Sequence, residues 1–121
     1  MYEVRVETHF SSAHHLLDYK GECEHVHGHN WRVEVFVQGE YLDTSGILVD
    51  FKVVKAILKE VIDYLDHKDL NTLSEFKGLS PSSEMIAKFI YEKMSAKRFN
   101  VSKVSVWETP TSCASYWVEK D

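Results

Sequence analysis

The sequence predicts one α+β domain over residues 1–121, in which a four-stranded antiparallel sheet carries two helices on one face. Two observations lead to this fold class. The two ends of the chain alternate apolar and polar residues with a period of two, and the segment between them has apolar residues at helical spacing. The order strand, strand, helix, helix, strand, strand is typical of an antiparallel sheet with its helices on one side.

Four strands are expected where apolar and polar side chains alternate. They cover residues 2–13, 31–39, 104–108 and 114–118. The first two strands are expected to pair antiparallel. Between them lies a polar loop, residues 16–30, which is rich in His and Glu and shows neither secondary-structure period, so chemistry is expected there.

Two amphipathic helices are expected in the middle of the chain. From Phe51 to about Leu65, apolar residues follow a helical period and lysines occupy the remaining face. A second helix is expected to begin within residues 80–84. Serine hydroxyls there can cap free amides, Pro81 suits the first turn, and Glu84 favours the positive end of the helix dipole.

The composition argues against several classes of function. The formal net charge is −5 at pH 7 and Lys and Arg are not clustered, so nucleic-acid binding is not expected. No segment is apolar enough to span a membrane, and the first residues do not resemble a secretory signal. A cytoplasmic protein is expected, in which Cys23 and Cys113 stay thiols, although the two can in principle pair.

A cluster of histidines carries the main functional prediction, since five of the seven lie between positions 14 and 29. In extended backbone, residues two apart point to the same side, so His27 and His29 can offer nitrogens to one ion. Pairing of the first two strands would bring His14 opposite them. Three protein ligands leave one zinc position open for water or substrate, as in catalytic zinc sites.

Other interpretations of these residues remain open. The histidines can be solvated loop side chains, since short motifs match freely. A closed structural zinc site with four ligands is also conceivable, formed by Cys23, His25, His27 and His29. No role is assigned to His9 or His15.

Cys23 is expected to act as an acid and base beside the metal rather than as a ligand. It lies four residues before His27, and a nearby cation lowers the pKa of a thiol toward neutrality, which suits proton transfer. Cys113, on the fourth strand, fits the alternative of a small buried hydrophobic residue.

Five short motifs follow one another from one end of the chain to the other. They are Phe10-Ser11-Ser12-Ala13-His14, Cys23-x3-His27-Gly28-His29, Leu65-Asp66-His67, Pro81-Ser82-Ser83-Glu84 and Trp107-Glu108-Thr109. With these motifs the chain resembles the 6-pyruvoyltetrahydropterin synthase family. The three residues between the cysteine and His-Gly-His resemble the bacterial 6-carboxytetrahydropterin synthase branch, whereas the animal pyruvoyl-forming enzymes have a longer spacer.

The resemblance implies an activity. The expected enzyme is a zinc-dependent lyase that converts 7,8-dihydroneopterin triphosphate to 6-carboxy-5,6,7,8-tetrahydropterin, acetaldehyde and triphosphate, on the route to queuosine and related deazapurines. The nearest alternative is the pyruvoyl-forming synthase, which eliminates triphosphate. A noncatalytic metal- or pterin-binding module is an alternative of a different class.

The resemblance also implies roles for the remaining motif residues. By position, Cys23 and His67 are the proton-transfer groups and Asp66 is the partner of His67, while the three cluster histidines are the zinc ligands. Without the resemblance, Asp66 and His67 would be ordinary residues at a helix C-terminus.

Substrate-binding residues follow in the same way. Glu108 is the expected pterin anchor, because a carboxylate can accept two hydrogen bonds from a guanidine-like edge. Ser82, Ser83 and Glu84 match a further pterin-binding segment, and helix capping is their alternative role.

A homo-oligomer is expected from the sheet itself. The outer strands of an open four-stranded sheet expose unpaired backbone groups, and closing several sheets into one barrel removes those edges. The resemblance implies such a T-fold-like barrel, in a trimer or a hexamer.

Overall fold

A four-stranded sheet is the frame of the molecule, and the computed structural model describes residues 1–20, 24–97 and 99–119. The strands are β1 (Tyr2–His14), β2 (His27–Gly39), β3 (Val101–Thr109) and β4 (Ser112–Tyr116). Each is antiparallel to its neighbour, and they follow one another across the sheet in chain order. The predicted antiparallel sheet is confirmed.

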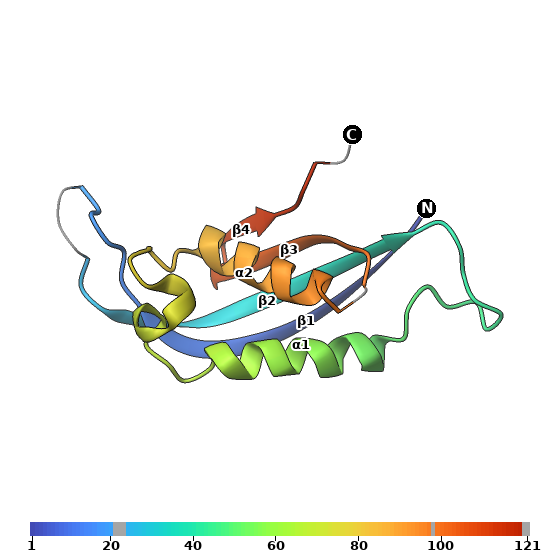
Figure 1. The fold of residues 1–121 in the computed structure, drawn as a ribbon, viewed down its shortest axis with the longest axis horizontal. Coiled ribbons are helices and arrows are strands. Elements are labelled where there is room, and N and C mark those ends of the chain that lie inside the picture. The colour runs from blue at the N-terminus through green and yellow to red at the C-terminus, as the bar shows by residue number, and fades with distance from the viewer. Residues whose placement is uncertain (21–23, 98, 120–121) are drawn as a thin grey trace.

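Two helices cover one face of this sheet (Figure 1), α1 (Phe51–Leu65) and α2 (Ser83–Ser95). Helix α1 packs on β1, and α2 packs on β3 and β4. Two short 3-10 helices, η1 (Leu70–Thr72) and η2 (Ser74–Phe76), lie between them in the chain. The predicted α+β class is therefore confirmed. Within the described segments, no helix is long and apolar enough to cross a bilayer.

Three local features differ from the prediction. Strand β2 begins at His27 instead of Trp31, because the polar residues before Trp31 pair with the end of β1 although they show no apolar alternation. Strand β4 ends at Tyr116, two residues earlier than expected, since its pairing with β3 ends there. Pro81 lies just before Ser82, the N-cap of α2, rather than in the first turn.

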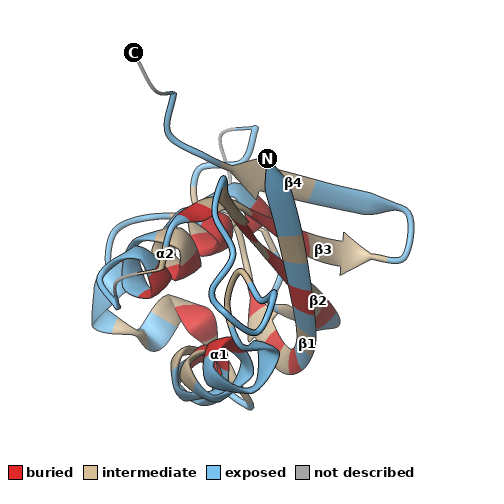
Figure 2. Ribbon diagram, turned by 90° about the vertical axis from the view of Figure 1, so that its right-hand side faces the viewer, coloured by how far each residue is buried: buried red, intermediate tan, exposed pale blue. Residues whose placement is uncertain are grey.

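The core lies between the helices and the sheet (Figure 2). Alternate residues of β1, β2 and β3 face the helices and are buried. The buried side chains include Val33 and Val35 of β2, Val104 and Val106 of β3, Leu58 and Leu65 of α1, and Ile86 and Ile90 of α2. Burying one Val, Leu or Ile contributes about 1.5–3 kcal/mol, so this alternation determines which face of each strand turns toward the helices.

The other face of the sheet is charged and carries no helix from residues 1–20, 24–97 or 99–119. Arg5 Nη1 donates to Glu7 Oε1 at 2.6 Å and to Glu34 Oε2 at 2.8 Å. Trp107 Nε1 donates to Glu34, and the Arg32 guanidinium lies 4.3 Å from the Trp107 ring centroid. The sheet thus has one apolar face under the helices and one polar face available to water or to another chain.

The N-cap of α1 allows a test of the fold. Asp50 accepts a hydrogen bond from Lys52 N at 2.8 Å, so Asp50→Ala is expected to lower the free energy of unfolding, measured by urea titration, by about 1 kcal/mol. Asp63→Ala is the matched control, because the exposed pair that Asp63 makes with Lys59 contributes at most about 0.5 kcal/mol. Equal losses in the two variants would contradict the capping role.

Candidate metal centre

Three histidine side chains converge where β1 ends and β2 begins. His14, the last residue of β1, pairs directly with His27, the first residue of β2. His29 lies two residues further along β2, so its side chain points to the same face as that of His27. The ring centroids of the three pairs lie 4.7, 4.8 and 5.3 Å apart. The strand pairing therefore brings the three predicted zinc ligands together.

Glu108, near the end of β3, joins the three histidines. Its Oε1 atom lies 3.0 Å from His14 Nε2 and 3.1 Å from His29 Nε2. The four potential ligand atoms all lie within 4.8 Å of one another. The sequence predicts a pterin anchor at Glu108. The contact of Glu108 with the histidines arises because β3 lies beside β2, and the alternation of side chains does not specify which strands are neighbours.

Backbone carbonyls determine which imidazole nitrogens are available. His14 Nδ1 lies 2.7 Å from the Pro81 carbonyl oxygen, and His27 Nδ1 lies 2.8 Å from the His25 carbonyl oxygen. A carbonyl only accepts hydrogen bonds, so Nδ1 donates in both rings, and Nε2 is the nitrogen left for a metal ion or, in His14, for the Glu108 carboxylate at 3.0 Å. This second contact is the usual way in which a metal-binding histidine is oriented. Sequence motifs could not reveal it, because the acceptors are backbone atoms.

The His29 ring tests whether the cluster fits a metal. Its Nε2 atom is buried and makes no hydrogen bond within the described structure, because Glu108 Oε1, although 3.1 Å away, is not aligned for one. Burial lowers the pKa of His29, against the opposing effect of the Glu108 carboxylate, so the ring is neutral at pH 7. An unpaired buried nitrogen costs about 1–3 kcal/mol, and a bound cation would remove that cost.

The donor set suits zinc. Three imidazoles with neighbouring carboxylate oxygen are typical zinc ligands. Zinc–nitrogen bonds are about 2.0–2.1 Å long, so donors that already lie within 4.8 Å of one another can close on one ion by small side-chain movements. The residues present fit a tetrahedral divalent cation.

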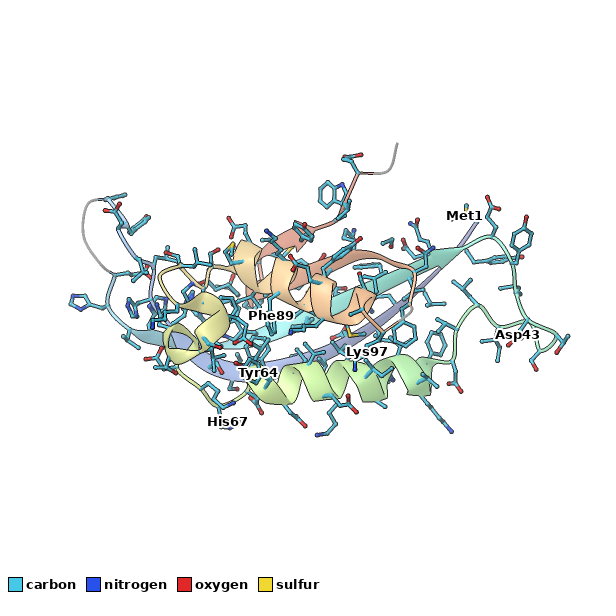
Figure 3. All side chains as sticks on the ribbon, in the orientation of Figure 1. Met1, Asp43, Tyr64, His67, Phe89 and Lys97 are labelled. Carbon is cyan, nitrogen blue, oxygen red and sulfur yellow. The ribbon has the colours of Figure 1, made fainter. Side chains whose placement is uncertain are left out.

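Asp66 and His67 form a pair, but outside the histidine cluster. Asp66 Oδ1 accepts a hydrogen bond from Ser11 N at 2.9 Å, and Oδ2 lies 2.9 Å from His67 Nδ1. The Ser11 amide, followed by the contact with His67, lowers the pKa of the Asp66 carboxyl. The His67 side chain is 82% exposed and points away from the sheet beyond the end of α1 (Figure 3). One chain by itself does not bring His67 to the candidate metal centre.

The Ser82-Ser83-Glu84 segment begins α2. Ser82 Oγ accepts from Met85 N at 3.2 Å, so the capping role considered for this segment is present. Ser83 is buried and Glu84 is exposed. The segment touches the cluster through Pro81, whose carbonyl orients His14.

The two cysteines have different outcomes. Cys23, the predicted acid and base, lies outside the described residues. Cys113 is exposed, so the interpretation of Cys113 as a buried hydrophobic residue is wrong. It lies on the edge strand β4, opposite Trp107, on the face of the sheet that has no helix to cover it.

An antiparallel sheet with two helices on one face, and a histidine cluster where its first two strands meet, defines a class of α+β enzymes with a metal site. Within that class, the chain belongs to the 6-pyruvoyl tetrahydropterin synthase family, whose model matches residues 3–119. The resemblance inferred from the five motifs is thereby confirmed.

Individual relatives support the same assignment. The chain is 37% identical to 6-carboxy-5,6,7,8-tetrahydropterin synthase of Synechocystis sp., over 97% of this chain and 94% of that protein. It is 33% identical to the Bacillus subtilis protein of the same name, over 98% and 87%. Among solved structures, Caenorhabditis elegans 6-pyruvoyl tetrahydropterin synthase superposes with a TM-score of 0.80 at 28% identity, over 98% of both chains.

Zinc titration separates the roles of the cluster residues. The wild-type chain is expected to bind one zinc ion tightly, in competition with a chromophoric chelator, and His29→Ala is expected to lose this binding. Glu108→Gln is expected to keep it, because three imidazoles hold zinc with one position open. If Glu108→Gln weakens zinc binding as strongly as His29→Ala, Glu108 is a ligand rather than a substrate anchor.

Proposed function

We propose that this chain is a zinc-dependent lyase that converts 7,8-dihydroneopterin triphosphate to 6-carboxy-5,6,7,8-tetrahydropterin, with release of acetaldehyde and triphosphate. The convergence of three imidazoles on one point carries the proposal. The names of the Synechocystis and Bacillus relatives support the carboxy product. A place in queuosine biosynthesis and a cytoplasmic location belong to the same proposal.

A pyruvoyl-forming synthase is the second candidate. The chain is 35% identical to the 6-pyruvoyl tetrahydrobiopterin synthase of Dictyostelium discoideum, over 88% of this chain. Against this stands the short spacer of three residues between Cys23 and His27. The two candidates differ in product, since the pyruvoyl enzyme keeps the three-carbon side chain of the substrate.

The residues of this chain suit the proton transfers of the proposed reaction. His14, His27 and His29 would hold the zinc ion. When bound, zinc lowers the pKa of hydroxyl groups on the substrate side chain. Cys23 and His67 then move protons between carbon atoms as weak acids and bases.

Two carboxylates and the N-terminal end of α2 complete the proposed site. Asp66 stays ionised, because its hydrogen bond from Ser11 lowers its pKa, and it orients the His67 ring. Glu108 accepts hydrogen bonds from the guanidine-like edge of the pterin. Ser82, Ser83 and Glu84 contribute to the pterin pocket.

A homo-oligomer, trimer or hexamer, completes the proposal. Strands β1 and β4 are the two edges of the sheet, and their edge backbone groups, apart from those of Ser11 and Ala13 that bind the chain after α1, can pair with another copy. His67 lies on the β1 edge, where its amide donates to Ser11 O at 2.6 Å. An exposed proton-transfer group beside an edge strand can serve the metal centre of a neighbouring copy, although not that of its own chain.

Product analysis tests the proposed reaction. Incubation of the zinc-loaded protein with 7,8-dihydroneopterin triphosphate is expected to yield acetaldehyde, trapped as a hydrazone, together with the carboxylated pterin detected by mass spectrometry. Retention of the three-carbon side chain would assign the pyruvoyl reaction instead.

Cys23→Ala tests the acid and base in this assay. Turnover is expected to fall by at least about 100-fold, the usual contribution of a general acid or base, while the zinc content stays unchanged. Cys113→Ala is the matched control and is expected to keep wild-type turnover, since Cys113 is an exposed thiol on strand β4. Loss of zinc from Cys23→Ala would make Cys23 a ligand and contradict this role.

Mixing two inactive variants tests whether copies share a site. His29→Ala and His67→Ala, dissociated and reassembled together in equal amounts, are expected to recover about a quarter of wild-type activity, because one in four random pairs of neighbours joins two intact halves. Sites contained within single chains would leave the mixture inactive. Sedimentation of the wild-type chain as a monomer at micromolar concentration would also contradict the proposal.

A further inference from the structure

A side chain outside the five motifs holds the end of β1. Asn71, in η1, accepts a hydrogen bond from His15 N on its Oδ1 at 2.9 Å, and its Nδ2 donates to His15 O at 3.0 Å. These two bonds are the pair that a neighbouring strand makes to one residue of an antiparallel ladder. A side-chain amide therefore holds the backbone immediately after His14, next to the contact between Ala13 N and Lys68 O.

The Asn71 amide is itself held in place. Asp69 Oδ1 accepts from Asn71 N at 3.1 Å and caps η1. The next residue, Leu70, is completely buried in the core. A capped turn anchored by a buried leucine gives Asn71 a fixed position from which to bind the His15 backbone.

His14 consequently lies between two anchored neighbours. On one side, Ala13 N donates to Lys68 O at 2.9 Å; on the other, both backbone groups of His15 bind Asn71. The His14 ring is 2% exposed, with Nδ1 against the Pro81 carbonyl. The direction of His14 Nε2 is thus determined by the backbone on which the ring stands.

We propose that Asn71 is a positioning residue for the metal centre. Its two hydrogen bonds to His15 fix the backbone of His14 and so raise the affinity of the three histidines for zinc. Asn71 acts through His14, and its contacts with the His15 backbone, beside which Asn71 Nδ2 lies 3.4 Å from His15 Nε2, give His15 a role in the same arrangement. The inference rests on the proposed zinc site.

Zinc affinity of the whole protein tests this role. Asn71→Ala is expected to weaken zinc binding at least about 10-fold, the usual effect of losing a group that orients a metal ligand. In the cobalt-substituted protein, the same variant is expected to shift the visible absorption bands, since they report ligand geometry. Asn100→Ala is the matched control: Asn100 Nδ2 donates to Gln38 O at 2.7 Å at the opposite end of β2, and its loss is expected to leave zinc affinity and spectrum unchanged.

Two further results decide the matter. Asn71→Asp keeps the acceptor for His15 N but not the donor to His15 O, so a zinc affinity between those of the wild type and Asn71→Ala supports the proposal. This variant also provides the test if Asn71→Ala does not fold. The role of Asn71 alone would be overturned if the wild-type protein binds zinc tightly and Asn71→Ala has the same zinc affinity and cobalt spectrum as Asn100→Ala. A wild-type chain that binds no zinc would overturn the proposed zinc site, and this inference with it.

Discussion

The register between β1 and β2 is the constraint on which the candidate site depends. His14 faces His27 only because the two strands pair residue by residue from Tyr2 opposite Gly39 onward. A shift of one residue would turn His27 and His29 to the opposite face of the sheet. Such a shift would also turn the buried side chains of β2 out of the core. The hydrophobic effect that stabilises the core therefore also determines the face of the sheet to which the imidazoles point.

The candidate metal centre lies on the same face of the sheet as the core, where the apolar side chains give way to polar ones. In β2, the cluster histidines stand on the same side as Trp31, which is completely buried, and the Trp31 ring lies 4.8 Å from the His14 ring and 5.2 Å from the His29 ring. In β3, Glu108 follows Val104 and Val106 on that side. A metal ion held here would lie next to an apolar surface. The low local dielectric constant there strengthens electrostatic interactions with charged groups of a substrate.

Much of this arrangement could be predicted. Alternation and helical spacing located the four strands and the helices α1 and α2. Five of these six elements have a buried face whose apolar residues show the period, and in β4 the alternation is present although its residues are exposed or partly buried. The start of β2 was missed because His27 to Asn30 are polar and extended at the same time, so no apolar pattern marks them. The contacts of Pro81 with His14 and of Asn71 with His15 could not be predicted, because they are hydrogen bonds between residues distant in the chain.

The sequence by itself determined the fold class and the family and indicated which three histidines come together, since periodicity and motif spacing are local properties of the chain. Only the tertiary structure decided that Glu108 lies against His14 and His29, and that the exposed His67 lies outside their cluster. These contacts depend on which strands lie side by side and on where the chain turns after α1. Long-range packing determines both, and no local pattern of residues encodes them.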